Sequence, residues 1–155
     1  MDYIRRLRSM VGNEKVIMVV ACAFVLDRDN RLLLQKRSDN GQWGLPGGFM
    51  ELGESVQDTA RREAYEETGL SLEDMELFGI YSGSHYDKTF PNGDQVSPVL
   101  IAFICKHYRG DLIEQNEESL QNIFYPLGDL PENIFTEHQM FINDFLANIS
   151  IPVVK

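Results

Sequence analysis

Residues 48–70 have the sequence GFMELGESVQDTARREAYEETGL, which joins a glycine loop to a helix rich in glutamate. Ser55 has the side chain of a helix N-cap, and Asp58 follows it by three residues, close to the spacing of a capping box. Gly69 stands where a left-handed C-cap belongs. We therefore predict a helix over residues 55–68.

Three glutamates gather on one side of this predicted helix. Glu63, Glu66 and Glu67 are spaced i, i+3 and i+4, so they are neighbours on a helix. At about 100° per residue, Glu63 and Glu67 point to the same side. That side also carries Val56 and Ala60, small apolar residues that should face the protein. A solvated acidic face is the alternative, and the inward direction of two carboxylates argues against it.

The inward carboxylates need a compensating charge, because buried carboxylates are normally paired or bound to a metal. In a helical-wheel projection, the outward face of this helix carries Asp58, Arg61, Arg62 and Tyr65. Arg62 could neutralise one carboxylate but not three. Oxygen ligands of this kind suit Mg²⁺ or Mn²⁺, and we predict such a cation here.

The loop before the helix supports this prediction. Gly47 and Gly48 allow a sharp turn and a close approach of the backbone to a ligand. Glu51 and Glu54 add two carboxylates just before the helix. Because the N-terminus of a helix also attracts anions, a metal and phosphates could be held together.

These features together resemble the Nudix box, G-x5-E-x7-R-E-U-x-E-E-x-G-U, in which U is a bulky apolar residue. Residues 48–70 fill every fixed position, and Ala64 is the one small residue at a U position. From average residue usage, a chance match in a chain of this length is on the order of one in ten million. Residues 32–47 also look like the family, whereas the resemblance beyond Gln95 is diffuse.

The resemblance implies an α/β fold, the Nudix-type α/β/α sandwich with a mixed β-sheet flanked by helices. It implies a metal-dependent pyrophosphohydrolase that cleaves the diphosphate bond of a nucleoside diphosphate linked to another moiety, by water attack on phosphorus. The implied cofactor is Mg²⁺ (or Mn²⁺), and the implied partner is a small nucleotide-diphosphate substrate.

The resemblance also assigns site residues by motif position. The metal ligands are Gly48, through its carbonyl, with Glu54, Glu63, Glu66 and Glu67. Among them Glu63 and Glu67 are the principal ligands, and Arg62 orients Glu63. The expected substrate contacts are Gly47, Gly48 and Tyr86, the last near a position where dinucleoside polyphosphate hydrolases carry a tyrosine.

The general base is either a glutamate of the box or a carboxylate from a later loop. Glu117 and Glu118, in the stretch IEQNEESLQ, are the candidates outside the box. Glu118 lies just before a predicted strand, so we expect it to approach the metal site, although each residue could equally belong to an acidic surface loop. The catalytic candidates are therefore Arg62, Glu66, Glu67 and Glu118.

The rest of the chain predicts a sheet and two further helices. Apolar runs predict strands over residues 16–26, 31–37, around 75–81, 96–107 and 120–127, with a hairpin turn at 27–30. Helical spacing predicts helices over residues 1–12 and 135–149. We expect the whole chain, 1–155, to form one domain. The helix in residues 1–12 docks either on that domain or on a partner subunit, and the second case would give a homodimer.

Composition narrows the partners. The chain of 155 residues has 43% hydrophobic residues and a formal net charge of −10, so it can build a core but repels polyanions. We expect neither a long nucleic acid nor a membrane as a partner. Cys22 and Cys105 lie in apolar runs and form no disulfide framework, so we expect a cytoplasmic protein.

Two other functions fit parts of the pattern. A non-catalytic Nudix-like nucleotide-binding or sensor module commonly loses box carboxylates, whereas this chain keeps them. An isoprenoid-diphosphate isomerase of related fold would need a cysteine as catalytic acid. The substrate is not resolved: the proline that many ADP-ribose hydrolases carry about fifteen residues after the box is absent, with His85 at that position.

Overall fold

The computed structural model describes residues 2–155. Along the chain the elements are α1 (Asp2–Val11), β1 (Val16–Val25), β2 (Leu32–Arg37), β3 (Trp43–Gly44), β4 (Gly47–Phe49), α2 (Val56–Thr68), β5 (Ser71–Leu72), β6 (Met75–Tyr81), η1 (Ser84–Tyr86), β7 (Lys88–Thr89), β8 (Gln95–Cys105), β9 (Tyr108–Arg109), β10 (Ser119–Tyr125), α3 (Thr136–Leu146) and β11 (Val153–Val154). Within the described residues the predicted helices and strands are present close to their expected bounds, and Met1 of the predicted N-terminal helix lies outside those residues.

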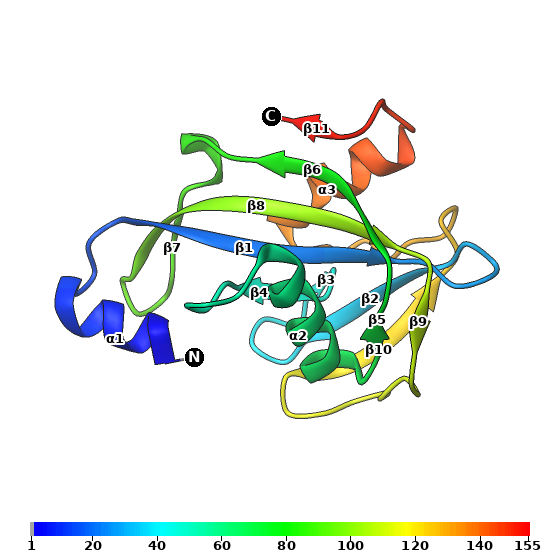
Figure 1. Cartoon of the computed structure of the whole chain (residues 1–155), viewed down its shortest axis with the longest axis horizontal. Coiled ribbons are helices and arrows are strands. Elements are labelled where there is room, and N and C mark those ends of the chain that lie inside the picture. The colour runs from blue at the N-terminus through cyan, green and yellow to red at the C-terminus, as the bar shows by residue number, and fades with distance from the viewer. Residues whose placement is uncertain (1) are drawn as a thin grey trace.

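A mixed sheet forms the centre of the molecule. Its strand order is β11-β6-β8-β1-β4, and β7 pairs with β8 (Figure 1). Strands β1 and β8 run parallel, whereas β4 is antiparallel to β1 and β6 is antiparallel to β8. Residues 21–25 of β1 are buried on both faces, as suits this central place, whereas Ile17 near the start of the strand is exposed.

Helices α2 and α3 cover opposite faces of this sheet (Figure 1). Successive side chains of a strand point to opposite faces. Accordingly, Ala23 of β1 lies in an apolar cluster with Ala64 of α2, whereas Phe24 lies in another with Phe141 of α3. The arrangement is the α/β/α sandwich expected from the sequence.

The predicted hairpin turn at residues 27–30 is confirmed, but the two strands that it joins do not pair beyond it. A turn does follow β1, with Asn30 at a φ of 57°, but β1 and β2 share an isolated bridge between Leu26 and Leu32. Strand β2 instead pairs with β10 and β3 in a second sheet. The physical reason is that β8 and β4 already occupy the two edges of β1. This second sheet brings residues from distant parts of the sequence together.

Helix α1 docks on its own domain. The N–H of Tyr3 donates to Oε2 of Glu51 at 3.2 Å, and Nη2 of Arg8 donates to the carbonyl of Gln95 at 2.6 Å. Docking on the domain, one of the two alternatives from the sequence, is thus observed, while pairing of subunits stays a prediction. In the described part of the chain, no helix has the length and hydropathy needed to cross a membrane.

Trp43, the one tryptophan of the chain, is buried in the second sheet. Its ring meets the ring of Tyr125 edge-on, with centroids 5.1 Å apart. The backbone N–H of Trp43 donates to the carbonyl of Asn133, and the backbone carbonyl of Trp43 accepts from the N–H of Phe135. Trp43 therefore links this sheet to the start of α3.

Candidate active site

Both ends of α2 are fixed by local hydrogen bonds. Oγ of Ser55 accepts the N–H of Asp58, and Oδ2 of Asp58 accepts the N–H of Ser55, both at 3.0 Å. Gly69 adopts the left-handed conformation, with φ of 79°, and its N–H donates to the carbonyl of Tyr65 at 2.9 Å. The predicted capping box and C-cap are confirmed. The two caps set where α2 begins and ends, and therefore where its glutamates lie.

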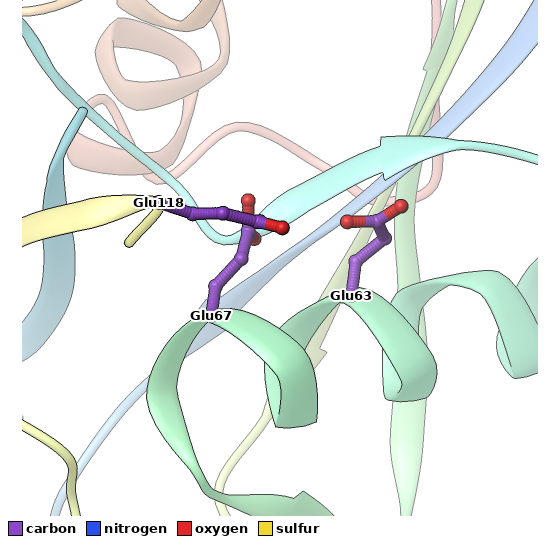
Figure 2. A group of neighbouring side chains, drawn as sticks. All are labelled: Glu63, Glu67 and Glu118. Atoms are coloured by element: carbon purple, nitrogen blue, oxygen red, sulfur yellow. The ribbon is translucent and has the colours of Figure 1, made fainter. Parts of the chain in front are cut away.

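Three carboxylates meet above α2. Glu63 and Glu67 rise from consecutive turns of the helix, and Glu118 reaches toward them from the residue before β10 (Figure 2). Each offers an oxygen, and these oxygens lie within 4.8 Å of one another. Glu63 is 8% exposed and Glu67 is 4% exposed, whereas Glu118 is exposed to solvent. The expected approach of Glu118 to the helix glutamates is therefore observed.

The surroundings oppose ionisation of the two buried glutamates. Burial raises the pKa of Glu67 to about 8, and the neighbouring charge of Glu63 acts in the same direction. Burial also raises the pKa of Glu63, although the hydrogen bond from Arg62 opposes the rise. Because two carboxyl groups that offer only oxygen atoms are crowded together here, the cluster has the chemistry of a site for a hard cation.

The glycine loop lies directly against these carboxylates. The N–H of Gly47 donates to Oε1 of Glu67 at 2.9 Å. A Cβ atom on Gly48 would lie 2.5 Å from Oε1 of Glu63, and one on Gly47 would lie 2.5 Å from the carbonyl oxygen of Ala21. A side chain at Gly47 would collide with the neighbouring strand, whereas a side chain at Gly48 would require the carboxylate of Glu63 to move. Contact of both glycines with substrate, and of the Gly48 carbonyl with a metal, stay predictions.

The prediction that the side chain of Arg62 lies on the outward face of the helix is wrong. Its side chain, 27% exposed, folds back over the helix start instead of facing solvent. Nε contacts Oε2 of Glu54 at 2.6 Å, and Nη1 contacts Oε1 of Glu63 at 2.8 Å. Nη1 also lies 3.4 Å from Oε2 of Glu66, and Nη2 donates to the carbonyl of Phe49 at 3.0 Å. One guanidinium thus contacts three carboxylates. Its contact with Glu63 is consistent with the orienting role that the resemblance implies for Arg62.

Glu54 and Glu66 lie outside the three-oxygen cluster. Hydrogen bonds from Arg62 hold the pKa of Glu54 down, at about 2, and Glu54 also accepts the N–H of Glu51 at 2.8 Å. The side chain of Glu66 is 47% exposed. Glu54 is therefore the partner of Arg62, and the predicted metal roles of Glu54 and Glu66 stay predictions.

Arg37 is a cationic neighbour of the cluster that sequence reasoning missed. It lies in β2 opposite Ser119, the residue after Glu118. Burial works to lower its pKa, but the hydrogen bond to Asp39 and the charges of Asp39, Glu67 and Glu118 raise it overall. The long-range pairing of β2 with β10 places Arg37 here, and no local sequence pattern announces that pairing.

Tyr86 and Glu117 lie apart from the cluster. Tyr86 is buried in the hydrophobic core, with its hydroxyl 2.6 Å from Sδ of Met140. Glu117 is exposed, and its carbonyl accepts a hydrogen bond from Oγ of Ser38. Substrate contact by Tyr86 stays a prediction.

The cysteines lie in the interior, as expected. Cys22 and Cys105 are both buried and unbridged. Burial raises the pKa of the Cys22 thiol to about 12. Burial also raises the pKa of the Cys105 thiol.

The chain is similar in sequence to known proteins. The family model described as "NUDIX domain" matches residues 16–145. An ADP-ribose pyrophosphatase from Methanocaldococcus jannaschii is 36% identical over 130 residues, which cover 82% of this chain and 72% of the relative. An 8-oxo-dGDP phosphatase from Homo sapiens is 34% identical over 123 residues, covering 76% of this chain but 35% of the relative.

Solved structures give the same result. A MutT protein from Bacillus halodurans matches with a TM-score of 0.68 and 30% identity, covering 83% of this chain and 82% of that one. A MutT protein from Methanosarcina mazei shares the fold, with a TM-score of 0.70 at 23% identity over 86% of this chain and 96% of that one. With its complete motif and its family match over most of its length, the chain belongs to the Nudix hydrolase family.

Proposed function

We propose that the chain is a divalent-metal-dependent pyrophosphohydrolase. Its reaction is cleavage of the diphosphate bond of a nucleoside diphosphate linked to another moiety, by attack of water on phosphorus. The observation that carries the proposal is the pair of buried carboxylates, Glu63 and Glu67, with Glu118 beside them. Within the described part of the chain no ion pair reaches Glu67, so a bound cation would supply the missing charge.

The donor set fits Mg²⁺ or Mn²⁺. Glu63, Glu67 and Glu118 offer oxygens only, which hard cations prefer, and the backbone of Gly48 borders Glu63. When bound, such a cation supplies charge neutralisation for the diphosphate and acidifies the attacking water. We assign these three glutamates as the residues that hold it.

The remaining residues have separate tasks. Arg62 holds the carboxylate of Glu63 in place by its 2.8 Å contact. Glu118, the exposed member of the cluster, is reached by solvent and accepts the proton of the attacking water. Arg37 places a positive charge beside the cluster, which suits an anionic substrate.

The relatives guide the choice of substrates. One is named an ADP-ribose pyrophosphatase and another an 8-oxo-dGDP phosphatase. Both names specify nucleoside diphosphate compounds. ADP-ribose and 8-oxo-dGDP are therefore the first substrates to test, followed by other nucleoside diphosphate derivatives.

The test is a substrate panel with Mg²⁺, scored for release of nucleoside monophosphate, beside Glu67→Gln. Glu117→Gln is the matched control, because Glu117 is an exposed glutamate outside the cluster. We expect hydrolysis that needs the metal, is lost in Glu67→Gln and is kept in Glu117→Gln. Reaction in ¹⁸O-labelled water should place the label on a phosphate product.

Two results would contradict the proposal. One is the absence of metal-dependent hydrolysis across the panel, and tight nucleotide binding in that case would favour the non-catalytic module. The other is full activity in Glu67→Gln. For Glu118 the separate check is Glu118→Gln, whose turnover and pH profile must both change if Glu118 accepts the proton.

A further inference from the structure

Residues 113–122 pack against the C-terminal end of α2. The hydroxyl of Ser119 and the side-chain amide of Asn122 both donate to the backbone carbonyl of Glu67, at 3.1 and 2.8 Å. Carbonyls in the last turn of a helix lack partners within the helix, so this segment satisfies them. Glu118 belongs to the same segment, so its position depends on the hydrogen bonds that hold its own backbone.

Asn116 makes contacts on both sides of this junction. Its Nδ2 donates to the carbonyls of Glu67 and Glu66, at 3.0 and 3.3 Å. Its Oδ1 accepts the backbone N–H groups of Glu118 and Ser119, each at 2.9 Å. One side-chain amide therefore connects the backbone of two helix glutamates to the backbone of the third glutamate of the cluster.

We propose that Asn116 is a positioning residue that sets the distance between Glu118 and Glu67. The inference rests on the proposed function, in which these carboxylates hold a cation and Glu118 accepts a proton. Asparagine suits this position because its amide offers a donor and an acceptor in a fixed plane. Its Oδ1 also closes a turn onto the residue two positions later, as asparagine commonly does.

The cluster needs such a fastening because its charges repel. The three oxygens lie within 4.8 Å of one another, and like charges this close drive exposed side chains apart. Glu118 is the exposed member, so it is the one free to move away. Its backbone is held at its N–H by Asn116 and at its carbonyl by the N–H of Ser38, at 3.1 Å. A shift of about 1 Å in a catalytic group can cost on the order of 100-fold in rate.

The competing explanation is that Asn116 only caps the C-terminal end of α2. A substitution of Asn122 distinguishes this explanation from the positioning of Glu118. Asn122 also caps the carbonyl of Glu67, but its side chain makes no described hydrogen bond to Glu118. Asn122→Ala is therefore the matched control. It should lower the unfolding free energy while leaving kcat and Mn²⁺ affinity unchanged.

The experiment is a double-mutant cycle with Asn116→Ala and Glu118→Gln. Mn²⁺ affinity is measured by electron paramagnetic resonance of the free ion, kcat is measured as a function of pH, and stability is measured by urea unfolding. We expect Asn116→Ala to weaken Mn²⁺ binding and lower kcat, each by about 10- to 100-fold. In the Glu118→Gln background the same substitution should change both by less than about twofold, because the two residues act as one unit.

The inference would be overturned if Asn116→Ala lowered Mn²⁺ affinity and kcat equally in the unaltered and the Glu118→Gln backgrounds. It would also be overturned if Asn122→Ala lowered kcat as much as Asn116→Ala does. If Asn116→Ala fails to fold, Asn116→Ser replaces it, since serine keeps an oxygen for the turn but cannot span to α2. The Mn²⁺ measurement needs no turnover. It therefore tests the position of Glu118 even if the unaltered protein hydrolyses no substrate, a result that would count against the proposed function alone.

Discussion

The backbone N–H of Gly47 lies 2.9 Å from Oε1 of Glu67 and donates a hydrogen bond to it, so the glycine loop and the acidic cluster form one unit. Gly47 also pairs with Cys22 of β1, which ties the loop to the central sheet. The carboxylate on α2 is thereby placed relative to the sheet through a single glycine. Neighbouring positions in this loop should consequently affect folding and chemistry differently.

Alanine at the two loop glycines should separate these effects. In Gly47→Ala the new Cβ would meet backbone and Cβ atoms of Ala21 and Cys22 at 2.5 to 2.7 Å, and we expect a loss of about 1–3 kcal/mol in unfolding free energy. In Gly48→Ala it would meet only the end of the Glu63 side chain among its three nearest atoms, which can move. We expect near-normal stability there, but a kcat lowered by about 100-fold.

Urea unfolding and steady-state kinetics of the two variants check this pair of outcomes. Comparable stability losses at both positions would mean that Glu63 cannot shift. Normal kcat in a folded Gly48→Ala protein would mean that the position of the Glu63 carboxylate matters little for turnover.

Glu67 should make the metal-free protein less stable as pH rises. Burial raises the pKa of its carboxyl from the ordinary 4.5 to about 8 in the folded protein, so the folded state binds the proton more tightly. The unfolding free energy therefore falls between about pH 4.5 and pH 8, by at most about 1.4 kcal/mol per pH unit. Glu67→Gln removes this penalty and should be more stable than the unaltered protein at pH 8, by about 1–3 kcal/mol.

Urea unfolding in EDTA at pH 5 and pH 8 measures the effect. The gain from Glu67→Gln should be small at pH 5 and larger at pH 8, even though the variant is expected to be inactive. A gain that is independent of pH would show that the carboxyl of Glu67 ionises normally.

Divalent cations should reverse that penalty. At 100 times its Kd, Mg²⁺ or Mn²⁺ should raise the unfolding free energy by about 2.7 kcal/mol, and EDTA should remove the gain. The gain should increase from pH 5 to pH 8, because the ligands must lose their protons to bind. Calorimetric Tm values with and without Mg²⁺ provide the measurement, with Glu67→Gln as the variant that responds least. An equal rise in Glu67→Gln would place the cation elsewhere.

Arg62→Lys should lower both activity and stability, although it keeps the positive charge. A lysine ammonium cannot reproduce the planar contacts of the guanidinium with Glu54, Glu63 and the Phe49 carbonyl. We expect kcat to fall by about 10- to 100-fold and the unfolding free energy to fall by about 1–2 kcal/mol. The matched control is Arg61→Lys at the preceding residue, whose side chain contacts only backbone carbonyls in the described hydrogen bonds. Similar kinetics for the two variants would contradict the prediction.

Local patterns explain why much of the fold and the box could be predicted. The caps at Ser55 and Gly69 act within one helix turn, and the i, i+4 spacing of Glu63 and Glu67 fixes their shared direction. The α/β/α layers followed from the motif and from the order of the elements. The position of Glu118 was anticipated only as one of two alternatives.

What sequence reasoning missed depends on pairing between distant segments. Arg37 comes beside Glu118 because β2 leaves β1 and pairs with β10, and no turn residue at 27–30 specifies that choice. The guanidinium of Arg62 folds back because its long side chain can reach three carboxylates that a wheel projection treats as lying on another face. Such contacts follow from side-chain length and sheet register.

The burial of Trp43 has a practical consequence. It is the one indole in the chain, it packs against Tyr125, and it is joined by backbone hydrogen bonds to the residues that lead into α3. Its fluorescence emission is therefore an intrinsic optical probe of the second sheet and of the docking of α3. A red shift on denaturation will report solvent entry into that region, so unfolding can be followed without an attached dye.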